Sequence, residues 1–276
     1  MPMIKKVIHI ADIHIPNADT QRPYGIMMDT LIEDVKKEVL STGNNEEVRI
    51  VIVGDIFHQK IKASNEARSL FHKMLNAFNS LCKTIIVAGN HDMLENNTNK
   101  LDSITPTFEI NHVYDNVIFA DMALNYKSGC ITDDNIVWAV YSMFDNFAPP
   151  QLPEQSMEGG KIVGLFHGAI KGAVTDSGYR TEIGGTLDGF TGCNCVMAGH
   201  IHKFQEMANE HTTLVYPSSV FQQNSGENVS GHGFVVWDMK NLTYKFHEVH
   251  NNFKIYKFEI SSYNDVKYNR EKLSNP

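Results

Sequence analysis

The chain has 276 residues and a mass of 31.1 kDa, with 42% hydrophobic and 20% charged residues. This composition is typical of a soluble globular protein, and no apolar run reaches the roughly 18 residues that a membrane-spanning helix needs. The net charge of −8 argues against a protein that holds nucleic acid by its overall field. It leaves open a nucleic-acid substrate that is bound locally or through a basic partner.

The N-terminus leads directly into a strand-like run at residues 7–10 and has no small-residue cleavage site, so we expect no signal peptide and no secretion. The spacing of the four cysteines fits no structural zinc pattern, and we expect buried, reduced thiols. These cysteines are Cys82, Cys130, Cys193 and Cys195. The chain also has 13 histidines, and several of them gather in the polar clusters described below.

The first third of the sequence alternates between strands and helices. Apolar runs at residues 6–11, 48–53 and 84–88 predict strands, and the β-branched run at 48–53 is typical of a strand covered on both faces. Residues 24–40 follow helical spacing, and a second helix is predicted to begin after Ser64 as its N-cap. This β-α-β-α-β order predicts a parallel sheet with right-handed crossovers.

Beyond residue 112, short strand-like runs dominate the sequence. They lie at residues 117–120, 136–141, 162–166, 195–198, 214–216, 234–237 and 243–249. Together the two halves predict an α/β fold: a sandwich of two mixed β-sheets flanked by helices. Residues 253–260 alternate like one more strand and lead into a polar tail. We therefore expect one domain over residues 1–250, with the start or remnant of a second small domain, or a tail, over 251–276.

Five polar clusters each close an apolar run, and each is rich in residues that bind metal ions. In order they are Asp12-Ile13-His14, Gly54-Asp55-Ile56-Phe57-His58, Gly89-Asn90-His91-Asp92, His167 and Gly199-His200-Ile201-His202. Divalent ions that act on phosphate esters take oxygen and imidazole ligands and keep a position open. Two such ions about 3.5–4 Å apart need a bridging carboxylate.

The spacing inside two clusters suggests paired ligands. Asp12 and His14 flank an apolar residue, as do His200 and His202, so an extended strand end would point both side chains of each pair the same way. Taken singly, most of these clusters are ordinary turns, and His167 alone would be a satisfied core histidine. Their joint occurrence at strand ends outweighs that interpretation, because open α/β sheets bind ligands at the carboxyl ends of their strands. The sequence therefore predicts a two-metal hydrolytic site.

The order of these motifs, from residue 12 to residue 202, resembles that of the calcineurin-like metallophosphoesterases. Within this superfamily, residues 54–58 followed by a helix resemble the nuclease branch. Its members are DNA double-strand-break repair and phage recombination nucleases partnered by a Rad50-like or SbcC-like SMC ATPase. Residues 216–219 and 233–238 resemble the end of that branch's phosphoesterase domain. The resemblance implies a metallophosphoesterase (nuclease) domain over residues 1–250 and the start or remnant of a DNA-capping domain, or a tail, over 251–276.

The resemblance implies a role for each matching residue. One ion would be held by Asp12, His14, Asp55 and His202, and the other by Asp55, Asn90, His167 and His200, so that Asp55 bridges the two. His91 would be the catalytic histidine, Asp92 would orient it, and His58 would help to place the DNA backbone. The two divalent metal ions are expected to be Mn, with Mg as the alternative.

The expected function is a Mn-dependent DNA exo/endonuclease subunit that hydrolyses phosphodiester bonds in recombination or repair. Its partners would be DNA and an SMC-like ATPase, in the cytoplasm or nucleoid of a bacterial or phage-infected cell. A phosphoprotein phosphatase or small phosphodiesterase of the same superfamily is the first alternative, which the acidic net charge favours slightly. A non-catalytic scaffold on the same fold is the second.

Two surfaces of the second helix have competing interpretations. Its apolar residues, Leu70, Phe71, Met74 and Phe78, would serve either a homodimer or ordinary packing on the sheet, and packing is favoured. A basic group near the same helix would meet either a phosphate backbone or solvent, and solvent is favoured. That group consists of Lys60, Lys62, Arg68, His72 and Lys73.

Overall fold

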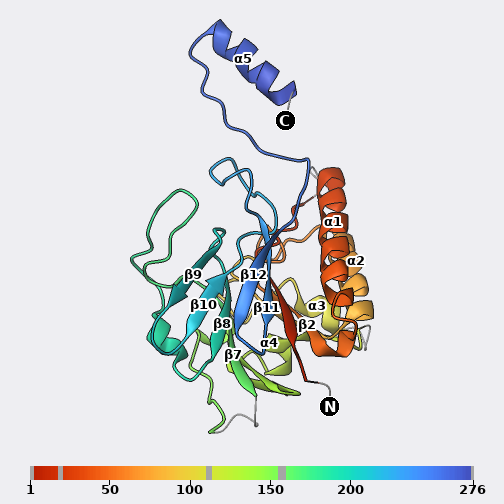
Figure 1. Ribbon diagram of the computed structural model, residues 1–276, viewed down its shortest axis with the longest axis vertical. Helices are drawn as coiled ribbons and strands as arrows, with labels where there is room; N and C mark the ends of the chain where they lie inside the picture. Colours follow the sequence, from red (N-terminus) through yellow and green to blue (C-terminus); the bar gives the residue numbers. More distant parts are fainter. Residues whose placement is uncertain (1–2, 18–20, 110–113, 155–159, 275–276) are drawn as a thin grey trace.

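The computed structural model describes residues 3–17, 21–109, 114–154 and 160–274. Its body consists of two six-stranded sheets packed face to face, with two long helices on the outer face of the first sheet (Figure 1). Each sheet contains both parallel and antiparallel neighbours. The predicted α/β sandwich of two mixed sheets flanked by helices, opening β-α-β-α-β, is confirmed.

The first sheet has a parallel centre and an antiparallel hairpin at one edge, in the order β12-β11-β1-β2-β3-β4. Its strands are β1 (Lys6–Ile10), β2 (Val48–Val53), β3 (Thr84–Val87), β4 (Val117–Phe119), β11 (Gly233–Asp238) and β12 (Thr243–Glu248). The crossover helices are α1 (Gln21–Leu40) and α2 (Asn65–Leu81). The predicted N-cap is confirmed, because the Ser64 side chain accepts a hydrogen bond from the Ala67 amide.

The second sheet has the order β5-β6-β7-β8-β10-β9. Its strands are β5 (Gly129–Asp133), β6 (Ile136–Tyr141), β7 (Lys161–His167), β8 (Cys195–Gly199), β9 (Gln205–Ala208) and β10 (Thr213–Tyr216). Short helical turns lie between the strands: α3 (Thr105–Phe108), α4 (Ala120–Ala123), η2 (Asn45–Glu47), η3 (Met143–Asp145) and η4 (Leu187–Phe190). The edge strands β5 and β9 were not predicted, because their sequences are only partly apolar.

Hydrophobic packing holds the layers together. One buried cluster lies between the two sheets and includes Val51, Trp138 and Trp237. Another lies between the first sheet and the helices α1 and α2. In α2, Phe71, Met74 and Phe78 are completely buried against the sheet, so the packing interpretation of this helix is confirmed.

The prediction of a strand over residues 253–260 is wrong. This segment is irregular, and it leads into the helix α5 (Tyr263–Ser274), which stands away from the sandwich in Figure 1. An alternating sequence forms a stable strand only when its backbone finds a partner strand, and none of the described strands pairs with this segment. Its attachment to the body includes Ile255, whose backbone N–H and C=O both bond to the Gln222 side chain, at 2.8 and 2.9 Å.

No helix in the described part of the chain is long and apolar enough to cross a membrane. The four cysteines are free thiols. Cys82, Cys193 and Cys195 are buried, as predicted, whereas Cys130 is half-buried.

A buried ionic cluster ties the two sheets together at the amino end of β2. The Arg49 guanidinium donates to both oxygens of Asp133, at 2.7 and 3.1 Å, and Lys83 Nζ lies 2.7 Å from the same carboxylate. Trp138 Nε1 completes the set of donors at 3.2 Å. Burial alone would raise the pKa of Asp133, but Arg49 and Lys83 hold it below its usual value.

We predict that Asp133→Asn lowers the free energy of unfolding by about 1.5–3 kcal/mol at pH 7, because it removes one of the two carboxylates that pair with the buried Arg49 guanidinium and leaves only Asp134. Since the folded-state pKa is depressed, the wild type has this contribution above the ordinary carboxyl pKa and loses it as the pH falls through the folded value. Wild type and variant should therefore converge in acid. Urea unfolding at several pH values measures this difference.

Glu33→Gln is the matched control, because Glu33 pairs with Lys36 on an exposed helix surface. Its effect should stay below about 0.5 kcal/mol. Equal losses for the two variants would contradict the role given to the buried cluster.

Candidate metal centre

The carboxyl ends of five strands, β1, β2, β3, β7 and β8, meet at one end of the sandwich. The two sheets approach closely there: His167 Nδ1 at the end of β7 lies 2.8 Å from the Val53 carbonyl oxygen at the end of β2. A Cβ atom on Gly199 would lie 2.1 Å from the same oxygen, so only glycine fits at that position. This approach brings side chains from both sheets into one site.

The first group of predicted ligands comprises Asp12, His14 and His202, whose potential ligand atoms all lie within 4.8 Å of one another. His14 Nε2 is 3.0 Å from His202 Nε2, and His202 Nε2 is 3.8 Å from Asp12 Oδ1. Asp55 Oδ2 lies 3.6 Å from His14 Nε2.

The second group comprises Asp55, His167 and His200, which also lie within 4.8 Å of one another. Asn90 Oδ1 belongs with them, at 2.9 Å from His200 Nδ1 and 3.2 Å from His167 Nε2. Asp55 Oδ1 is 3.3 Å from His167 Nε2, whereas Asp55 Oδ2 faces the first group. The Asp55 carboxylate thus lies between the two groups.

The donor atoms fit divalent cations. Burial lowers the pKa of His14 well below its usual value and lowers that of His200 to about 4, so both imidazoles are neutral at pH 7. Burial would also raise the pKa of Asp55, but His167 and His14 hold it well below its usual range. Burial would lower the pKa of His167, but Asp55 raises it to about 10, so this imidazole carries a proton that a bound ion would displace. Imidazole nitrogens converging with a carboxylate and an amide oxygen form a mixed N/O set that suits transition-metal ions.

The backbone reaches this arrangement in a different way from the one predicted. Asp12, His14, Asp55 and His200 have positive φ angles, of 52, 50, 50 and 97°, so the pairs Asp12/His14 and His200/His202 do not project from extended strand ends. Such angles are uncommon for residues with side chains and are found at functional sites where the surroundings enforce them. Here the Asp12 amide donates to the Gly54 carbonyl, and the His14 amide donates to the Asp55 carbonyl.

The structure gives Asp92 a different role from the predicted one. Its buried carboxylate accepts hydrogen bonds from the amides of Ile56, Phe57 and Gly89, and so fixes the turns that carry Asp55 and Asn90. The expectation that Asp92 orients the His91 ring is therefore wrong. The His91 Nδ1 atom instead lies 2.6 Å from the His58 carbonyl oxygen, to which it donates.

The predicted catalytic histidines lie beside the first ligand group. The ring centroids of His91 and His14 are 4.8 Å apart, and those of His58 and His14 are 5.5 Å apart. His58 is exposed to solvent, and desolvation by neighbouring groups together with the charge of His91 lowers its pKa. Both imidazoles are therefore within reach of a ligand bound at the centre.

Glu227 was missed by the sequence analysis. Its Oε1 atom lies 2.9 Å from His202 Nδ1, and its Oε2 atom accepts the Gln223 amide at 2.8 Å. Burial would lower the pKa of His202, but Glu227 and Asp12 raise it to about 9. Glu227 lies in a polar segment 25 residues beyond His202, and no local sequence pattern links the two. A carboxylate that holds the far nitrogen of a ligating histidine fixes its orientation.

The basic group beside α2 is largely engaged within the protein. Lys60 pairs with Glu95, Lys73 pairs with Asp29, and His72 Nδ1 lies 2.7 Å from the Tyr114 hydroxyl. Arg68 approaches the Ser103 carbonyl at 3.5 Å. These contacts favour the solvated-surface interpretation of this group.

Comparison with known proteins identifies the family. The sequence model of the calcineurin-like phosphoesterases matches residues 5–204. The chain therefore belongs to this metallophosphoesterase family, whose members are metal-dependent phosphoester hydrolases.

An uncharacterised protein of Acanthamoeba polyphaga mimivirus is 32% identical over 258 residues, which cover 91% of this chain and 18% of the viral protein. The chain thus spans less than a fifth of that relative's length. Among solved structures, a hypothetical protein from Pyrococcus horikoshii shares 14% identity, with a TM-score of 0.44 and coverage of 98% of this chain and 93% of that chain. A metallophosphoesterase from Sphaerobacter thermophilus shares 13% identity, with a TM-score of 0.37 and coverage of 100% and 96%.

We predict that Glu227→Gln weakens metal binding about 10–100-fold, because His202 loses its charged partner while the fold is retained. Titration calorimetry with Mn²⁺ measures the affinity directly, without reference to activity. Glu248→Gln is the control, since Glu248 is an acidic residue whose carboxylate accepts the Gly231 amide and touches no predicted ligand. Unchanged affinity in Glu227→Gln would show that this carboxylate does not support the centre.

Proposed function

We propose that the chain is a DNA nuclease: a phosphodiesterase domain that uses two divalent ions, Mn with Mg as the alternative. The observation that carries this proposal is the position of Asp55, whose two carboxylate oxygens face separate groups of ligands. In this assignment Asp12, His14, Asp55 and His202 hold one ion. The other is held by Asp55, Asn90, His167 and His200.

Two ions held by these residues would act as Lewis acids on a bound phosphate ester and would lower the pKa of water there. The protein's own contribution centres on His91. Because its Nδ1–H donates to the His58 carbonyl, the Nε2 atom is left to carry the second proton of the imidazolium. In our proposal His91 gives that proton to the leaving oxygen, and His58 binds the adjacent phosphate backbone.

The motif order of the nuclease branch and an exposed His58 beside the centre support a DNA substrate. A role in recombination or repair, an SMC-like ATPase partner and a homodimer belong to the same proposal. The net charge of −8 favours a second candidate, a phosphoprotein phosphatase or small phosphodiesterase, because an acidic surface repels DNA.

A digestion experiment separates these candidates. With Mn²⁺, the wild type should shorten end-labelled single-stranded or duplex DNA, and His91→Ala should slow cleavage about 10²–10⁴-fold. Calorimetry should show that His91→Ala still binds metal. His211→Ala, which alters an exposed histidine away from the centre, is the matched control and should cleave normally.

Intact DNA together with turnover of p-nitrophenyl phosphate would select the phosphatase alternative. Loss of metal binding in His91→Ala would assign this histidine to ligation and not to proton transfer.

A further inference from the structure

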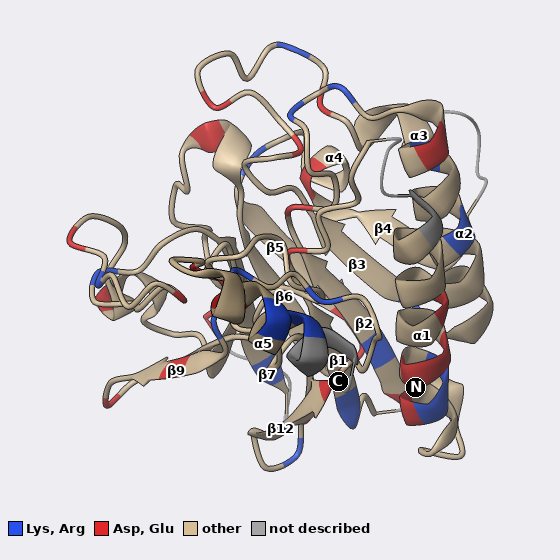
Figure 2. Ribbon diagram, turned by 90° about the horizontal axis from the view of Figure 1, so that it is seen from above, with Lys and Arg blue, Asp and Glu red and all other residues tan. Residues whose placement is uncertain are grey.

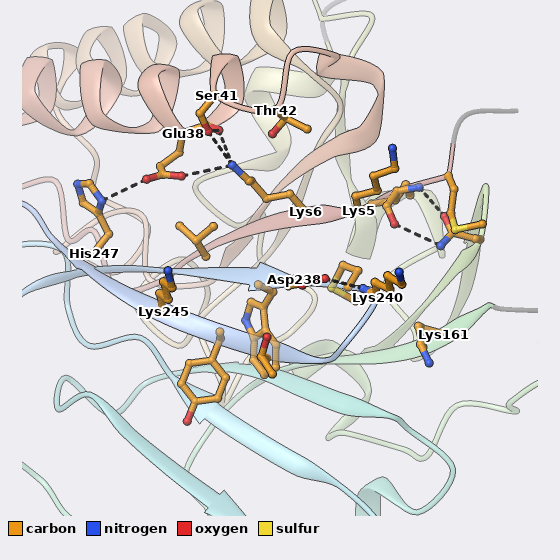
Figure 3. Close-up of a pocket in the computed structure, with 18 of the residues that line it drawn as sticks. Lys5, Lys6, Glu38, Ser41, Thr42, Lys161, Asp238, Lys240, Lys245 and His247 are labelled. Carbon is orange, nitrogen blue, oxygen red and sulfur yellow. Dashed lines mark hydrogen bonds and ion pairs between the residues drawn. The ribbon is translucent and has the colours of Figure 1, made fainter.

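A concave site lies at the opposite end of the sandwich from the metal centre. It is a hollow of about 980 Å³ between the last turn of α1 and the β11–β12 hairpin (Figure 3). Residues 3–6, which lead into β1, line it, whereas the metal centre follows the other end of the same strand. Nothing in the proposed phosphodiesterase chemistry uses this hollow.

The hollow is basic although the chain as a whole is acidic. Its lining includes five lysines and only two acidic residues. Lys5 and Lys6 are paired with Glu47 and Glu38. The other three lysines, Lys161, Lys240 and Lys245, form no ion pair within the described residues. Basic segments also lie beside the β12 label in Figure 2.

The two acidic residues do not neutralise these three lysines. The Asp238 carboxylate is occupied by the turn between the strands, where it accepts the amides of Lys240 and Asn241. Glu38 is shared between Lys6 and His247. The hollow therefore presents uncompensated positive charge.

The free edge of β12 borders this hollow. β12 is the outermost strand of its sheet, and residues 243–247 all line the hollow. The Val249 amide donates to the His232 carbonyl across the hairpin, so residues 247, 245 and 243 also direct their backbone groups towards β11. The N–H and C=O groups of Tyr244 and Phe246 consequently face outward, where no described strand pairs with them.

The two faces of β12 differ in chemistry. Lys245 and His247 lie on the face towards α1, where His247 contacts Asp34 and Glu38. Tyr244 and Phe246 lie on the other face, with ring centroids 4.8 Å from Trp237 and 4.7 Å from Phe204. A strand added beside β12 would therefore meet positive charge on one face and aromatic rings on the other.

We propose that the edge of β12 binds an extended segment of a partner polypeptide in which acidic and apolar residues alternate. The segment adds to the sheet as a seventh strand, with backbone hydrogen bonds to Tyr244 and Phe246. Its acidic side chains lie beside Lys245 and its apolar side chains lie beside the aromatic rings.

This occupant fits better than two others. A second copy of the chain, paired edge to edge, would place lysine near lysine, and edge lysines are a known means of preventing such pairing. Nucleic acid has no strand backbone to pair with the outward amides, and the net charge of −8 repels it.

The test uses a fluorescein-labelled peptide of five Glu-Val repeats and measures fluorescence anisotropy with the whole chain. We expect saturable binding. A peptide of equal composition with five Glu followed by five Val should bind at least about tenfold more weakly. In its extended form each face carries both acidic and apolar side chains, so neither face matches one face of β12. N-methylation of alternate amides should abolish binding for one set of positions and spare it for the other, since only one edge of the peptide faces β12.

The double variant Lys240→Glu/Lys245→Glu should weaken binding of the alternating peptide at least tenfold. Lys100→Glu/Lys127→Glu makes the same change of charge at two exposed lysines outside the hollow and should bind like the wild type. Both variants should retain the wild-type circular dichroism spectrum and Mn²⁺ affinity, because neither touches the metal centre.

Three outcomes would overturn the proposal. The first is no saturable binding of the alternating peptide, and the second is equal binding of the alternating and block peptides. The third is a duplex oligonucleotide that binds more tightly than the peptide and depends on Lys240 and Lys245, which would make the hollow a nucleic-acid surface. None of these outcomes bears on DNA cleavage at the metal centre, so the two proposals succeed or fail separately.

Discussion

The close contact between the two sheets at their carboxyl ends is the constraint on which the centre depends. His167 of the second sheet reaches the Val53 carbonyl of the first, and Gly199 leaves room for that approach. Each sheet alone carries only part of the ligand set. Four of the ligands follow strands of the first sheet: Asp12, His14, Asp55 and Asn90. In the second sheet, His167 ends β7, and His200 and His202 follow β8. Packing between the sheets is thus also what assembles the site.

Much of the fold could be predicted because its signals are local. Continuous β-branched runs, helical spacing and the Ser64 cap each indicate an element from a few adjacent residues. The strand expected at 253–260 failed for the opposite reason, since alternation records a local preference but cannot supply a partner strand. The edge strands β5 and β9 were missed because their extended conformation depends on pairing with β6 and β10, which their own sequences do not record.

At the metal centre, too, features set by adjacent residues could be predicted and features set by contacts between distant segments could not. The seven predicted ligands come together because strand ends in a sandwich converge, which motif order alone anticipates. The sequence did not reveal the positive φ angles at Asp12, His14, Asp55 and His200, which depend on bonds between neighbouring loops. It also misassigned Asp92, since adjacency to His91 says nothing about where a carboxylate points. The role of Glu227 could not be predicted, because its partner His202 lies 25 residues away in the sequence.

The Gln222 side chain has a consequence that reaches beyond its own loop. Its amide group holds the backbone of Ile255 on one side and the Glu227 carbonyl on the other, and Glu227 in turn holds His202. The segment that leads to α5 is therefore three hydrogen-bonded steps from a predicted metal ligand. The position of this segment and the orientation of His202 therefore share one amide side chain, that of Gln222.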